Sequence, residues 1–140
     1  MRLSTKGRYG LKIMYYLAKY SSDEPTPLSE IAENMELPEN YLEQLVRKLK
    51  KANLVVSTRG AHGGYSLARS PKDITIGDIF RNMENQFFSA ESALEDNIFK
   101  RSDAVAEMIV YKRIQSYLDE AVDDYTLEDM LSDEKKQMSL

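Results

Sequence analysis

The segment from Ser57 to Arg69 reads STRGAHGGYSLAR and combines the residue types that a contact with a DNA groove needs. It holds three of the chain's six glycines and its only histidine. Glycine keeps a turn slim, and a narrow minor groove has an enhanced negative potential that attracts an inserted arginine. The segment therefore predicts a thin basic probe for DNA, with contacts from Arg59, Gly60, His62, Gly63 and Gly64. A hairpin turn that needs glycine only for its backbone geometry is the open alternative for Gly63 and Gly64.

The stretch from Asn40 to Lys51, NYLEQLVRKLKK, carries a second set of polar side chains. Its leucines and valine recur at helical spacing and are expected to face inward. Glutamate accepts a hydrogen bond from cytosine N4 and glutamine pairs with adenine N6 and N7, whereas lysine and arginine suit phosphates. The candidate DNA contacts are Asn40, Tyr41, Glu43, Gln44, Arg47 and Lys48, with Lys50 and Lys51 as further phosphate ligands. A solvated helix surface is the alternative, as charged runs usually are.

A run of helices and one hairpin must position these two segments. A helix is predicted over Thr5–Tyr20, with Leu11, Met14, Tyr15 and Ala18 at helical spacing and Ser4 or Thr5 as its cap. Helices over Ser29–Met35 and Tyr41–Ala52 follow across a short turn, which is helix-turn-helix spacing, and Asn53 suits the end of the second. Strands over Leu54–Thr58 and Tyr65–Ala68 then form a hairpin. This order is a winged helix.

The C-terminal half is expected to be helical as well. Thr75 suits the cap of a helix over Ile76–Glu84, and Thr126 with Asp129 suits the start of a short last helix. Between them, apolar residues mark a long helix of roughly five turns. The predicted fold is thus mainly α with a small β-hairpin: a winged helix-turn-helix domain over 1–84 (helix-turn-helix about 28–52, wing 54–68), a loop over 85–103, a long dimerisation helix and short terminal helix over 104–131, and a flexible tail over 132–140.

Composition excludes several classes of function. The chain has no cysteine and one histidine, which rules out disulfides, thiolate-bound metals and multi-histidine metal sites. Residues 1–70 carry 11 Lys and Arg against 7 Asp and Glu, whereas residues 71–140 carry 8 against 16. A basic half joined to an acidic half favours nucleic-acid contact by one part only. No apolar run approaches the ~18 residues that a membrane span needs, and the N-terminus has no apolar signal segment, so a cytoplasmic protein without membrane contact is expected.

An enzyme is poorly supported. The chain has no serine–histidine–aspartate set and no glycine-rich phosphate loop before a helix. The adjacent Asp123 and Asp124 are expected on a helix surface. A binding module of another kind stays open: the winged helix could serve mainly in protein interaction, with the acidic C-terminal half as the contact surface, because fold alone does not settle function.

Four motifs together resemble the Rrf2 family of bacterial winged-helix transcription regulators: STKGRYG, YLEQL, RG-x-x-GGY and ITIGDI. The likeness runs from Met1 to about Glu84 and resumes through the long helix to TLEDML. It implies a homodimer, acting as a repressor, on double-stranded DNA with a palindromic operator. Glu43 and Gln44 would face bases, Arg59 would enter the minor groove, and Ser4, Thr5, Lys6 and Arg8 would lie against phosphates. The long helix would pair with its twin through residues among Val105, Met108, Ile109, Ile114, Leu118 and Val122. Packing of these residues within one chain is the alternative.

The sequence departs from many family members at one point. Those members hold an iron–sulfur cluster through three cysteines in the loop after the ITIGDI helix, whereas this loop has none, so no cofactor is expected. The family also contains cluster-free repressors of cysteine metabolism that act with cysteine synthase, and this chain is most similar to that branch in YGL-x-IM and TLEDM. The loop of that branch opens with a GPI-like stretch, whereas this one reads NQFFSAESALED. Phe87, Phe88 and Phe99 are a candidate receiving surface for the controlling signal, or they pack against the dimer helix.

Overall fold

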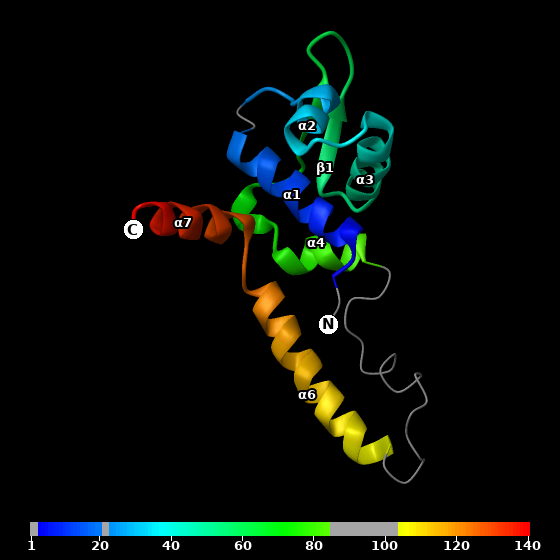
Figure 1. Cartoon of the computed structure of the whole chain (residues 1–140), viewed down its shortest axis with the longest axis vertical. Helices are drawn as coiled ribbons and strands as arrows, with labels where there is room; N and C mark the ends of the chain where they lie inside the picture. Colours follow the sequence, from blue (N-terminus) through cyan, green and yellow to red (C-terminus); the bar gives the residue numbers. More distant parts are fainter. Residues whose placement is uncertain (1–2, 21–22, 85–103) are drawn as a thin grey trace.

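The computed structural model describes residues 3–20, 23–84 and 104–140. Figure 1 shows a compact domain from which a hairpin loop projects at one end and a long helix at the other. The helices are α1 Thr5–Tyr20, α2 Leu28–Met35, α3 Glu39–Lys51, the 3-10 turn η1 Pro71–Asp73, α4 Ile76–Met83, α6 Ala104–Asp123 and α7 Leu127–Met138. The strands are β1 Val55–Thr58 and β2 Gly64–Leu67. The predicted winged-helix order is confirmed, and the predicted loop over 85–103, with its three phenylalanines, lies outside the described residues.

The core lies between α1, α2, α3 and α4. Each helix contributes apolar residues at helical spacing, and the core side chains of the four helices are less than 9% exposed. From α1 to α4 the most buried are Ile13, Met14, Leu17, Ile31, Leu42, Leu45, Val46, Leu49, Ile79 and Met83. Burial of apolar surface is the main stabilising term of such a fold. It fixes α3 with its polar face outward.

Backbone capping explains where α3 ends. Asn53 has a left-handed backbone (φ 61°), which asparagine tolerates better than most residues. The Asn53 N–H donates to the Lys50 carbonyl (3.0 Å), and the Leu54 N–H donates to the Leu49 carbonyl (3.0 Å). This pair of bonds is a Schellman motif. It turns the chain from α3 directly into β1, as expected from Asn53.

The second strand of the hairpin is paired on both of its edges. β1 and β2 pair antiparallel, with Val55 opposite Leu67 and Thr58 opposite Gly64. Tyr65 also pairs with Thr26, whose N–H donates to the Tyr65 carbonyl (2.9 Å) and whose carbonyl accepts from the Tyr65 N–H (2.8 Å). The wing is therefore held on both sides, by β1 and by the segment that precedes α2.

The last helix is longer than predicted. α7 continues to Met138, so the prediction that regular structure stops near residue 131 is wrong. Glu134 explains the extension, because its carboxylate binds both the Lys19 ammonium and the Tyr15 hydroxyl on α1. Lys135 and Lys136 in the last turn also suit the negative end of the helix dipole. As predicted, Thr126 caps the helix in a reciprocal pair of bonds with Asp129.

This docking of α7 has a titration signature. Burial, and then the hydrogen bond to Glu134, raise the pKa of Tyr15 to about 12. A raised phenol pKa means that the contact stabilises the fold below pH ~10 and that this contribution is lost as pH rises toward 12. Glu134→Gln should therefore lower the Tyr15 pKa, measured by NMR of the labelled tyrosine ring. Tyr125, whose pKa is raised to about 12 chiefly by its bond to Asp133, is the internal control. Equal shifts at both tyrosines would contradict this account.

Candidate nucleic-acid interface

The outward face of α3 is uncovered by the part of the chain that the structure describes. Glu43, Gln44 and Arg47 are exposed, as is Asn40 in the first turn, and Tyr41 and Lys48 are half-buried. Arg47 Nη2 lies 3.3 Å from Glu43 Oε1 with both side chains more than half exposed. Such a surface ion pair contributes little to stability, so both side chains are available to a partner. The predicted base and phosphate contacts thus share one accessible surface.

The wing lies beside α3. Lys50 Nζ donates to Ser57 Oγ across 2.6 Å, which links the end of α3 to β1. Beyond this link the residues of the tip, from Arg59 to His62, are exposed. Figure 1 shows the tip extending past α2 and α3 into solvent. A slim basic loop and a polar helix therefore project from neighbouring elements of one domain.

Two of the three wing glycines are required by the fold. A Cβ on Gly63 would lie 2.2 Å from the Thr58 carbonyl oxygen, and one on Gly64 (φ 154°) would lie 2.3 Å from that of Thr26. Both distances are below van der Waals contact. The surroundings of Gly63 and Gly64 therefore support the alternative that the hairpin needs glycine at these positions for its geometry. Gly60, by contrast, has a φ of 109° with no atom near its Cβ position, so its constraint is the backbone conformation of the turn alone.

The N-terminal segment adjoins the start of α3. The ring centroids of Tyr9 and Tyr41 are 6.1 Å apart in an edge-to-face arrangement, which brings the STKGRYG and YLEQL motifs together. Ser4 caps α1 through its hydroxyl, which accepts from the Gly7 N–H (3.2 Å). Thr5, Lys6 and Arg8 are exposed. The sequence analysis did not identify Tyr9 as a contact between the two motifs, although Tyr9 is an aromatic residue within STKGRYG.

A shallow basic depression lies at the other end of α3. It has a volume of about 390 Å³ and is lined by Lys48, Lys51, Ala52 and Asn82. Asn82, from α4, was not among the predicted residues, and its side-chain amide donates to the Asp78 carbonyl (2.6 Å). Nothing in the local sequence around Asn82 signals its place beside α3. The depression extends the positive surface of α3 toward α4.

The long helix α6 carries an exposed apolar surface. Val105 is 72% exposed, Ile109 66% and Ile114 42%, and Val110 and Tyr117 are exposed as well. Leu118 and Met108 are half-buried. Large exposed apolar surfaces mark interaction sites. The described part of the chain provides no cover for this one.

One predicted interface residue belongs to the chain's own core. Val122 is only 9% exposed and packs with the buried residues of the domain. Its inclusion among the dimer contacts is therefore wrong, since the base of α6 lies on α4 and turns this side chain inward.

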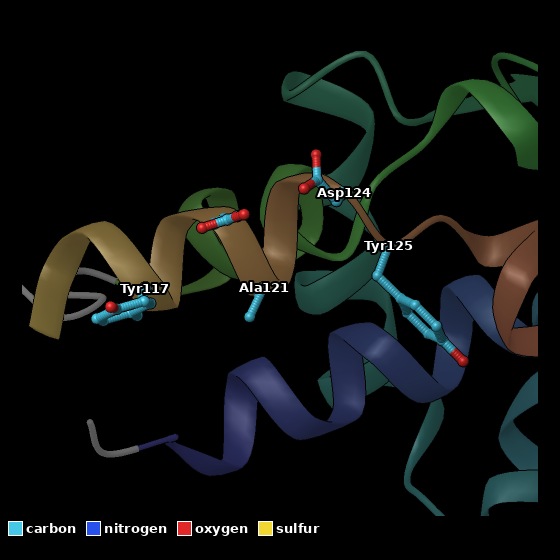
Figure 2. Close-up of a pocket in the computed structure, with 5 residues that line it drawn as sticks. Tyr117, Ala121, Asp124 and Tyr125 are labelled. Atoms are coloured by element: carbon cyan, nitrogen blue, oxygen red, sulfur yellow. The ribbon is translucent and has the colours of Figure 1, made fainter.

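An acidic depression of about 470 Å³ lies at the junction of α6 and α7. Figure 2 shows Tyr117 and Tyr125 at its two ends with Ala121 between them. Glu120 and Asp124 complete the lining. The depression is thus aromatic and negatively charged, opposite in sign to the surface of α3.

No group of three potential metal ligands occurs among the described residues, and no described helix has the length and apolar character to cross a bilayer. A thiolate-held iron–sulfur cluster needs cysteine sulfurs, and the whole chain has none. The donor set of this chain therefore does not fit such a cluster.

The fold and its exposed surfaces define a winged helix-turn-helix protein with a projecting apolar helix. A family model described as Rrf2, iron-dependent transcriptional regulator, matches residues 3–133. The chain belongs to the Rrf2 family of transcriptional regulators. It is 46% identical over 132 residues to the HTH-type transcriptional regulator CymR of Bacillus subtilis, covering 94% of this chain and 91% of that protein.

Other relatives and solved structures also match this chain over most of its length. The chain is 31% identical over 133 residues to protein rrf2 of Nitratidesulfovibrio vulgaris, covering 95% of this chain and 89% of that one. The solved structure of B. subtilis CymR, described as the global cysteine regulator, superposes with a TM-score of 0.79 at 42% identity, over 94% of this chain and 97% of the other. That of IscR from T. potens gives 0.74 at 39% identity, over 98% and 90%. These relatives are transcription regulators, which supports the expectation that this chain is not an enzyme.

Proposed function

We propose that this member of the Rrf2 family is a dimeric repressor that binds a palindromic operator without an iron–sulfur cluster. One observation carries the proposal: the polar face of α3 and the basic wing are adjacent, exposed and joined by the Lys50–Ser57 hydrogen bond. A second copy joined through the exposed face of α6 would repeat this pair of elements. Two-fold symmetric proteins bind two half-sites about one helical turn apart.

Each candidate DNA-binding residue has a role in this proposal. Glu43 and Gln44 read base edges in the major groove, with Asn40 and Tyr41 beside them. Phosphates are held by Arg47 and Lys48 on α3, by Ser4, Thr5, Lys6 and Arg8 at the start of α1, and by His62 in the wing. Arg59 enters the minor groove, and the slim backbone at Gly60, Gly63 and Gly64 lets it do so.

The regulated pathway proposed is cysteine or sulfur metabolism. The support is the similarity to B. subtilis CymR, whose structure is described as that of a global cysteine regulator. A chain without thiols cannot sense redox state through its own cysteines, so control by a partner protein such as cysteine synthase is part of the proposal. Adding purified cysteine synthase should change the affinity of this protein for its operator. An unchanged affinity would reject cysteine synthase as the controlling partner.

Selection of binding sites from a random duplex library tests the proposal. Wild-type protein should select a two-fold symmetric motif. Gln44→Ala should relax preference at one base pair in each half-site, because a bidentate contact discriminates by about 1–3 kcal/mol. A motif that Gln44→Ala leaves unchanged would remove Gln44 from base reading, and no motif for the wild type would reject the proposed function.

Arg59→Ala provides a separate prediction for the wing. Binding should weaken most at sites whose flanks are A·T-rich, since their narrow minor groove attracts arginine most strongly. Gel-shift titrations on sites with A·T-rich and G·C-rich flanks measure this difference. Arg47→Ala is the matched control, because loss of a phosphate contact should weaken both sites equally. An equal loss on both sites for Arg59→Ala would contradict minor-groove reading.

The alternative function is a protein-interaction module that acts through the acidic C-terminal half. The depression lined by Tyr117, Glu120, Ala121, Asp124 and Tyr125 favours it. Gel shifts on genomic fragments at low and moderate salt separate the two functions. No sequence preference at either salt concentration would favour this alternative.

A further inference from the structure

At the base of α6, Arg81 of α4 binds two carboxylates of α6. Arg81 Nη2 lies 2.7 Å from Asp119 Oδ1 and 3.1 Å from Asp123 Oδ2, and its Nη1 also bonds Asp123. Asp119 and Asp123 stand one turn apart on α6, so one planar guanidinium spans a full turn of the facing helix. Charge-assisted bonds of this forked kind fix orientation as well as distance. Arg81, Asp119, Asp123 and Gly77 are called the Arg81 joint below.

The helices of the joint are in close contact. A Cβ on Gly77 would lie 2.1 Å from Asp123 Oδ1 and 3.2 Å from Val122 Cγ2. Val122 is only 9% exposed. The glycine therefore lets α6 lie directly on the first turn of α4, and the arginine one turn later secures it there.

A pair of backbone bonds closes the joint from the other side. The Ile76 N–H donates to the Tyr125 carbonyl (2.9 Å), and the Leu127 N–H donates to the Ile74 carbonyl (3.0 Å). The segment that leaves α6 is thus bonded to the segment that enters α4. Because α4 also packs on α1 and α3, the direction of α6 is coupled to the helix that carries Glu43 and Gln44.

We propose that Arg81 is a positioning residue that fixes the direction of α6 and thereby sets which half-site spacing the dimer accepts. This inference rests on the proposed function. A 20-residue helix is about 30 Å long, so a tilt of about 10° at its base moves its far end by about 5 Å. That exceeds the rise of one base pair, roughly 3.4 Å. The joint lies at the C-terminal end of α6, and Figure 1 shows α6 and α4 at the opposite end of the domain from the wing tip.

Variants of the joint test the proposal on palindromes whose centre is lengthened or shortened by one or two base pairs. Wild type should prefer one spacing. For Arg81→Ala, and for Asp119→Asn combined with Asp123→Asn, the affinity ratio between preferred and shifted spacings should fall roughly tenfold, within the usual range for coupled sites. If only net charge mattered, the two variants would change DNA affinity in opposite directions. Loss of the arginine would weaken binding to DNA, whereas loss of two carboxylates would strengthen it. Weaker binding to the preferred spacing in both variants therefore points to geometry.

Arg69→Ala is the matched control, because Arg69 also pairs with a carboxylate of α4, Asp78 (3.4 Å), whereas among the described residues it forms no ion pair with α6. It should keep the wild-type spacing ratio. If Arg81→Ala fails to fold, Arg81→Lys carries the test, since an ammonium lacks the fork that spans both aspartates. A spacing ratio that survives in the joint variants would overturn the proposal, as would their dissociation to monomers in sedimentation.

A readout without DNA separates this inference from the proposed function. The chain has no cysteine, so His62→Cys takes a single spin label at each wing tip. The distance distribution between the two labels should be narrow in an otherwise wild-type dimer and broad when Arg81→Ala is added. Equal widths would overturn the role of Arg81 even if the DNA results stand. A broadened distribution with no selected DNA motif would instead reject the proposed function alone.

Discussion

Ile109→Glu combined with Ile114→Glu is expected to convert the protein to monomers and to lower operator affinity about a hundredfold or more, because linked binding to two half-sites gains 10²–10⁴ in avidity. The two side chains are 66% and 42% exposed on α6, so the glutamates are not expected to disturb the fold of one chain. Between two copies they would place uncompensated charges in an apolar contact, which is costly.

Sedimentation gives the oligomeric state of this variant, and gel shifts on the selected operator give its affinity. Ser132→Glu with Gln137→Glu adds the same two charges at exposed positions of α7 and serves as the matched control. The control should stay dimeric and bind normally. A dimer that persists in the α6 variant would show that the exposed apolar residues Ile109 and Ile114 of α6 are not the contact.

Gly64→Ala is expected to destabilise the domain by about 2–4 kcal/mol, since it combines a strained backbone with a steric clash. The added methyl carbon would lie 2.3 Å from the Thr26 carbonyl oxygen, which accepts one of the two hydrogen bonds that join Thr26 to Tyr65. The wing would have to separate from the segment before α2. Chemical denaturation followed by circular dichroism measures the free energy of unfolding.

Gly60→Ala is the matched control for this prediction. Gly60 also has a positive φ, of 109°, but no atom lies within 4 Å of its Cβ position. It should cost only about 1 kcal/mol, from backbone strain alone. If the two variants lose the same stability, close contact at Thr26 is not what selects glycine at position 64.

Most of the fold follows from local signals in the sequence. Leu42, Leu45, Val46 and Leu49 were expected to face inward on α3, and all four are buried. Helix caps were equally predictable, because Thr75 and Thr126 each form a reciprocal pair of hydrogen bonds with an aspartate three residues later. These features depend on neighbours within one turn of chain, so the sequence pattern contains them.

The errors involve contacts between distant residues. For α1 the expected face was Leu11, Met14, Tyr15 and Ala18, whereas the fully buried side chains are Ile13, Met14 and Leu17. Tyr15 lies at the edge of the buried face, and its hydroxyl donates to Glu134 on α7, 119 residues away. The same distant contact extends α7 beyond its expected end.

The sequence predicted only part of the candidate interface. Exposure of Gln44 and Arg59 follows from helix periodicity and turn composition, so both were predictable. Tyr9, Asn82 and Arg81 gain their positions only when α1, α3, α4 and α6 pack. Such packing between distant helices leaves no periodic pattern in the sequence. The positions of these three residues therefore follow only from the structure.

Groove-specific cleavage of the operator tests the central claim most directly. Because the chain has no cysteine, Gln44→Cys and His62→Cys each accept one tethered hydroxyl-radical reagent. Cleavage from position 44 should be staggered between the strands in the sense of a major-groove source, and cleavage from position 62 in the opposite, minor-groove sense. Each pattern should appear twice, related by the two-fold axis of the site. The account would be contradicted if both positions gave cleavage with the same stagger between the strands, or if each operator showed a single cleavage pattern. Either result would rule out a dimer that places α3 and the wing in neighbouring grooves.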